Sequence, residues 1–147
     1  MTNELLKSIF IETLKAKNTI FDDFNSPNEN TVTLKASGEN LDEISIYITF
    51  SVMESGAYLI SIGCYDLPNF SKHYDIGVKT CNQLNDDELV KYYIDEDGDA
   101  VSHTTLLFNA YSVTSDFSAE QVLICATMMA TSVDDTYPIL EKAKWAN

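Results

Sequence analysis

The stretch that decides the fold of this chain spans residues 74–111 and reads YDIGVKTCNQLNDDELVKYYIDEDGDAVSHTTLLFNAY. Its first part places apolar side chains at helical spacing (Tyr74, Val78, Cys81 and Leu84), and this predicts a helix that ends near Asn85. Alternating runs follow at residues 90–94 and 101–111, separated by the acidic turn 95–99. Because an Asp-Gly step between alternating runs favours a hairpin, these runs predict two paired strands.

The residues before this stretch predict one helix and three strands. An apolar stripe at helical spacing indicates the helix (Leu6, Phe10 and Leu14). This pattern fades near Asn18, resumes at residues 20–24 and ends at the breaker cluster 25–28. Alternation then predicts strands at residues 31–36, 44–52 and 58–64. The short connection after residue 52 leaves no room for a parallel crossover, so we expect these strands to be antiparallel.

The last part of the chain predicts a long, unusually apolar helix. Ser118 and Gln121 fit a capping box at its start. Apolar residues then cover more than one of its faces, so we expect this helix to be buried on several sides or to meet a partner. Pro138 lacks the backbone N–H that a helix interior needs, and it predicts an interruption over residues 134–138.

Together these elements predict a single α+β domain over residues 1–147. The expected order is helix, three strands, helix, two strands, helix. The sheet is expected to be twisted and largely antiparallel, with the helices packed on it.

The sequence is strongly acidic, and this disfavours several classes of partner. It has 23 acidic residues against 9 basic ones, all of them Lys, and a formal net charge of -14. Nucleic acids and anionic membranes attract basic surfaces, so we expect neither as a partner. The three cysteines are widely spaced in apolar patterns, as expected for buried free thiols in a reducing compartment. No secretory signal or membrane-length apolar run is present, and we expect a cytoplasmic protein.

The motifs around the hairpin resemble one known family. They are Asn82-x-x-Asn85, the run from Lys91 to Asp99, and Asp135-x-Tyr137-Pro138 after the capped helix. This pattern resembles the YbjN family, described as bacterial sensory-transduction regulators that share the fold of type III secretion chaperones. Those chaperones are small acidic cytosolic proteins, usually homodimers. The resemblance, which covers residues 44–145, implies that fold and a binding or regulatory role, and it assigns no catalytic residue.

The residues themselves indicate no catalytic, metal or cofactor site. Asp95, Asp97 and Asp99 suggest a calcium loop, but Gly98 precedes the third Asp and position twelve is a Leu, so an EF-hand is excluded. A weak surface cation site at this turn stays open beside the hairpin interpretation. His73 and His103 have no zinc spacing, and the cysteines lack the polar setting of a nucleophile. We therefore expect no enzyme activity and no cofactor.

The remaining candidates are interaction surfaces. Several strand tyrosines must point outward, and Tyr is enriched at protein interfaces, so we select five as candidate partner-binding residues (Tyr47, Tyr58, Tyr92, Tyr93 and Tyr111). The excess apolar surface of the last helix makes Leu123, Ile124 and Met128 candidates for a homodimer interface. The favoured hypothesis is a chaperone-like or regulatory protein that docks a protein segment. The alternative is an acidic decoy that mimics nucleic acid and binds a basic protein.

Overall fold

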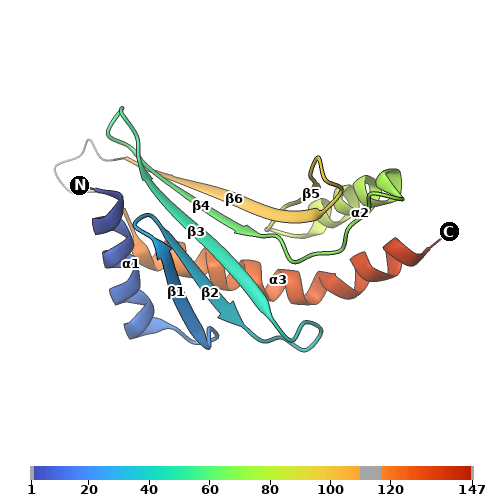
Figure 1. Cartoon of the computed structure of the whole chain (residues 1–147), viewed down its shortest axis with the longest axis horizontal. Helices are drawn as coiled ribbons and strands as arrows, with labels where there is room; N and C mark the ends of the chain where they lie inside the picture. The colour runs from blue at the N-terminus through green and yellow to red at the C-terminus, as the bar shows by residue number, and fades with distance from the viewer. Residues whose placement is uncertain (1, 110–116, 147) are drawn as a thin grey trace.

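A computed structural model of the chain describes residues 2–109 and 117–146, and it has three helices and six strands in that part (Figure 1). The order along the chain is one helix, four strands, one helix, two strands and one helix. Their bounds are α1 Asn3–Lys17, β1 Asp23–Asn28, β2 Thr31–Ala36, β3 Ile44–Val52, β4 Tyr58–Cys64, α2 Tyr74–Asp87, β5 Tyr92–Ile94, β6 Ala100–Phe108 and α3 Ala119–Trp145.

The strands form one open sheet in which every neighbouring pair is antiparallel. Their order is β1-β2-β3-β4-β6-β5. The α+β class and the antiparallel sheet are therefore confirmed. The two edges of the sheet are poor pairing surfaces, since β5 has three residues and β1 contains Pro27 and an irregular register between Asn25 and Asn28.

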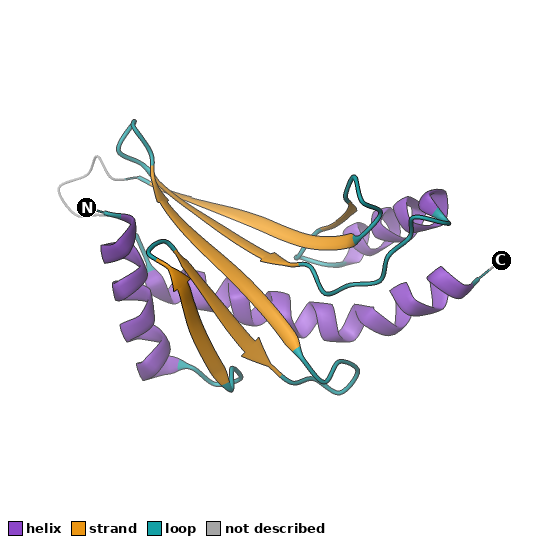
Figure 2. Ribbon diagram, in the orientation of Figure 1, coloured by secondary structure: helices purple, strands orange, loops and turns teal. Residues whose placement is uncertain are grey.

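Helix α3 runs along one face of the sheet (Figure 2), and the hydrophobic core lies between this face and the helices. The alternation seen in the sequence decides this, because every second residue of β2, β3 and β4 points to the helices, and all of these except the partly buried Val52 are buried. Leu6, Phe10 and Leu14 pack onto this face from α1, and Phe10 contacts Phe50 with ring centroids 5.5 Å apart. We call the opposite side of the sheet, which no helix of the described chain covers, the free face.

Strand β1 corrects the expected element order. Residues 20–28 were predicted to continue the first helical pattern and end in a breaker, but residues 23–28 pair with β2 as an edge strand. All six β1 residues are exposed. Because no side chain of this strand enters the core, its sequence has no alternation of apolar and polar residues, and its pairing rests on backbone hydrogen bonds.

Helix α3 corrects the expected interruption near Pro138. The helix continues through residues 134–138 to Trp145. A proline leaves the carbonyl four residues earlier without its helical partner, here that of Asp134. The side-chain amide of Asn40, in the loop between β2 and β3, donates to this carbonyl at 2.9 Å. The missing helical bond is thus replaced from outside the helix. Ser118 caps the start of α3 as predicted, accepting from the Gln121 N–H.

Candidate functional site

The free face is a surface of the sheet that the described helices leave uncovered. Its central strands alternate buried residues toward the helices with residues that point away from them. Three zones follow along the strands: aromatic residues at one end, Ser and Thr in the middle, and Leu59 and Leu107 at the other end. Leu107 is 67% exposed. In register, Tyr47 lies opposite Gly63, and Gly63 lies opposite His103.

Three half-exposed tyrosines gather at the aromatic end of the free face, and we call them the tyrosine cluster (Tyr47, Tyr65 and Tyr93). The rings of Tyr47 and Tyr65 have centroids 5.6 Å apart and are tilted by 47°. Burial raises the pKa of Tyr65, and the neighbouring phenols of Tyr93 and Tyr47 raise it further. All three phenols therefore belong to one local environment. The exposed fractions are 37% for Tyr47, 47% for Tyr65 and 48% for Tyr93.

Gly63 allows Tyr65 to take its place in the cluster. A Cβ atom added at Gly63 would lie 2.5 Å from the Tyr65 hydroxyl oxygen, which is closer than real side chains approach. The hydroxyl end of Tyr65 therefore lies over the backbone of β4, the strand that precedes it, at a residue that has no side chain. This arrangement leaves the Tyr65 ring beside that of Tyr47.

The structure separates the tyrosines that the sequence grouped together. Tyr47 and Tyr93 lie on the free face, whereas Tyr58 and Tyr92 are buried, with 6% and 2% of their surfaces exposed. Neither Tyr58 nor Tyr92 is therefore available to a partner in this structure. Tyr111 lies outside the described residues. Tyr65 was not selected, although it directly follows the inward-facing Cys64 and strand alternation alone places it outward.

Tyr92 has an internal structural role instead. Its hydroxyl lies 2.6 Å from Ser132 Oγ, and Thr136 Oγ1 donates to it at 3.0 Å. Ser132 in turn donates to the Glu88 carboxylate at 3.2 Å. Burial raises the pKa of Tyr92, and the bonds to Ser132 and Thr136 oppose part of this rise. The buried phenol thus links β5 to α3 through a chain of hydroxyl groups.

The candidate dimer residues line a groove on the outer side of α3. One hollow of about 270 Å³ is lined by Leu123, Ile124 and Met128. Lys17 and Glu120, which form an ion pair, also line this hollow. A second hollow of about 310 Å³ shares Thr127 and Met128 with the first. Ile124 is 57% exposed and Met128 37% exposed, whereas Leu123 is 7% exposed and contributes mainly to the core. The structure therefore brings the three residues together but leaves two of them accessible.

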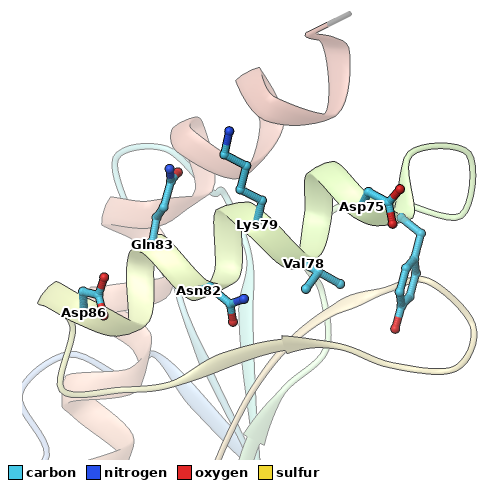
Figure 3. A pocket seen from close by; sticks show the side chains of 7 residues that line it. Asp75, Val78, Lys79, Asn82, Gln83 and Asp86 are labelled. Atoms are coloured by element: carbon cyan, nitrogen blue, oxygen red, sulfur yellow. The ribbon is translucent and has the colours of Figure 1, made fainter.

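The outer side of α2 carries a further depression, shown in Figure 3. Every residue that lines it comes from this one helix, and the labelled side chains fan outward rather than converge on a point. Asn82 is exposed here. Its partner in the sequence motif, Asn85, lies three residues later on the helix, is half-buried and bonds the Tyr92 backbone. We assign no chemistry to this surface.

The groups considered for catalysis or metal binding are dispersed. Burial raises the pKa of Cys64 and of Cys81 to about 11, and it also raises the pKa of Cys125, so the thiolates needed for nucleophilic attack are scarce at neutral pH. At the acidic turn, Asp95 Oδ1 accepts from the backbone N–H groups of Asp97 and Asp99, as in a hairpin turn. Across residues 2–109 and 117–146, no three His, Cys, Asp or Glu side chains gather as a possible metal site.

Comparison with known proteins adds no relative: no protein-family model and no curated protein matches this chain. None of the described helices combines the length and apolar character needed to cross a membrane.

Proposed function

We propose that this protein is a non-enzymatic cytosolic binding or regulatory protein of the YbjN type, with a secretion-chaperone-like fold, that docks a protein segment on the free face of its sheet. The observation that carries this proposal is the tyrosine cluster. Tyr47 lies on β3, Tyr93 on β5 and Tyr65 directly after the end of β4, and each keeps between a third and a half of its surface exposed.

An outward-facing tyrosine has properties that favour the binding of a partner. A tyrosine ring offers a large, rigid apolar area with a polar tip, and it loses little conformational entropy on binding because it has few rotatable bonds. Tyr65 is further fixed by lying over Gly63 beside the Tyr47 ring. A surface whose rings are already held in place binds with less ordering cost than a flexible one.

The edges of the sheet favour docking on the face rather than addition of a strand. Strand addition needs a long edge with unpaired N–H and C=O groups. Here β5 is three residues long, and β1 carries Pro27 and an irregular register. We therefore expect a bound segment to lie on the free face. Between the aromatic and the leucine ends of this face, Ser and Thr side chains such as those of Thr49 and Ser61 offer hydrogen bonds.

A selection experiment tests this proposal with the full-length chain. A library of random linear peptides is selected against the wild-type protein, and the affinity of the enriched peptides is measured for two variants. The first combines Tyr47→Ala, Tyr65→Ala and Tyr93→Ala; the control combines Ile124→Ala and Met128→Ala on α3. We expect at least about tenfold weaker binding to the tyrosine variant and unchanged binding to the control. Equal binding to the wild type and the tyrosine variant would contradict the proposal.

We propose in addition that two copies of the chain associate through the groove on α3. Ile124 and Met128 lie one helical turn apart and form an accessible apolar strip. Leu89, which is 80% exposed, lines the second hollow together with Met128 and extends this strip beyond the helix. In such a dimer the α3 groove and the free face are separate surfaces, so pairing leaves the tyrosine cluster accessible.

A further inference from the structure

We infer that the segment that docks on the free face is basic, and that it seats a guanidinium or ammonium group on the tyrosine cluster. This inference rests on the proposed function and names the chemistry of the partner. Its evidence is the charge of the chain and of the residues that flank Tyr65 and Tyr93, together with the exposed rings of the tyrosine cluster.

The described strands of the sheet contain few lysines. The described strands contain one lysine, Lys35, and its ammonium group is paired with Glu43 at 2.9 Å. Lys91, two residues before Tyr93, donates to the carbonyl oxygens of Asn85 and Glu88 at the end of α2. These two lysines are thus engaged with oxygen partners. Glu43 raises the pKa of Lys35, and the nearby Tyr47 phenol adds to this rise.

Exposed acidic residues flank two tyrosines of the cluster along the chain. Asp66 directly follows Tyr65, and Glu96 and Asp97 lie in the turn after β5, which carries Tyr93. These three residues are exposed. Asp66, Glu96 and Asp97 are thus near Tyr65 or Tyr93 along the chain, and the formal net charge of the whole chain is -14. This charge attracts cations and repels acidic segments before contact is made.

The tyrosine rings themselves offer faces on which a cation can bind. The face of an aromatic ring carries negative potential, and Arg and Lys groups bind over it, Arg more often than Lys. A tyrosine phenol is neutral at physiological pH, and burial and the neighbouring Tyr93 raise the pKa of Tyr65 further above this range. A neutral, half-exposed ring beside Tyr47, in a strongly acidic chain, suits a planar guanidinium that stacks on it.

Two synthetic peptides test the inference with the full-length protein: a short peptide of alternating arginine and threonine, and the same peptide with neutral citrulline in place of arginine. We expect the arginine peptide to bind at least about tenfold more tightly in a titration at low salt, and to lose much of this advantage at high salt. Equal affinity for the two peptides overturns the inference.

Gly63 supplies a variant that disturbs the cluster without removing a tyrosine. Gly63→Ala places a methyl group where the Tyr65 hydroxyl lies, so the ring must swing away, while the strand itself gains a better strand former. We expect about tenfold weaker binding of the arginine peptide to Gly63→Ala, and unchanged binding to Ser61→Ala, which lies on the same strand and face. Should Gly63→Ala fail to fold, Tyr65→Leu against Tyr65→Phe makes the same comparison, because only Phe keeps the ring.

The outcomes separate this inference from the proposed function. Peptides from the library that need the tyrosines but contain no excess of Arg or Lys would overturn the basic partner and leave the docking face standing. Arginine-peptide binding that is unaffected by Gly63→Ala and by the triple tyrosine variant would overturn the inference, since the acidic surface alone would then bind the cations, and the library test would still decide the docking face.

Discussion

Asn85 shows at the scale of one residue how a sequence motif can serve the fold. Its side-chain amide donates to the Tyr92 carbonyl at 2.8 Å and accepts from the Tyr92 N–H at 2.7 Å. One side chain thereby reproduces the bonds that a neighbouring strand would make, and it ties β5 to the end of α2. Lys91 adds two bonds to the last carbonyls of that helix end, at Asn85 and Glu88.

We expect Asn85→Ala to lower the free energy of unfolding by about 1–3 kcal/mol, because it leaves the partly buried N–H and C=O of Tyr92 without partners. Asn82→Ala is the matched control, since Asn82 belongs to the same motif but is exposed on the outer side of α2. Its effect should stay within about 0.5 kcal/mol. Urea denaturation of both variants measures the difference, and equal values would refute the role given to Asn85.

At the scale of an element, Asp134 and Asn40 clamp α3 to the loop between β2 and β3. The Asp134 carboxylate accepts backbone N–H bonds from Glu39, Asn40 and Leu41 at 2.9–3.0 Å. Burial alone would raise the pKa of Asp134, but these three bonds outweigh it and hold the pKa below its usual value. The same loop supplies the Asn40 amide that lets the helix continue past Pro138.

This clamp predicts a pH-dependent cost for Asp134→Asn. A carboxyl with a lower pKa in the folded than in the unfolded state stabilises the fold above its unfolded pKa of about 4, and the stabilisation is lost as pH falls through the folded value. We expect Asp134→Asn to cost about 1 kcal/mol at neutral pH, and the gap to the wild type to narrow below about pH 4. Asp135→Asn, exposed on the next residue, should show no such cost. A constant gap across the pH range would argue against the clamp.

The elements also show why sequence patterns predicted part of the fold and missed the rest. A strand with one buried face, such as β3, can be predicted from the alternation of apolar and polar residues. Strand β1 buries no side chain, so its sequence has no such alternation. Pro138 predicts a break because the sequence does not reveal the distant Asn40 that replaces the lost bond. For the site, alternation places Tyr65 outward, but choosing between adjacent Tyr92 and Tyr93 requires the register with β6.

At the scale of the whole molecule, association of two copies has a direct measurement. We expect light scattering across a concentration series to give a dimer at micromolar protein, and Ile124→Glu with Met128→Glu to give a monomer, because two carboxylates would be desolvated in the groove. Ile139→Glu is the control, as Ile139 is 51% exposed on the same helix but outside the groove. A wild-type monomer at all concentrations would contradict the pairing and leave the free face unaffected.

The central claim is that the free face of the sheet is the binding surface, and amide chemical-shift mapping tests it most directly. Spectra of the full chain are recorded with and without a peptide from the library selection. We expect the largest shifts at Tyr47, Tyr65, Tyr93 and His103, on neighbouring strands of that face. Shifts confined to the α3 groove around Ile124 and Met128, with the tyrosine cluster unmoved, would contradict the claim.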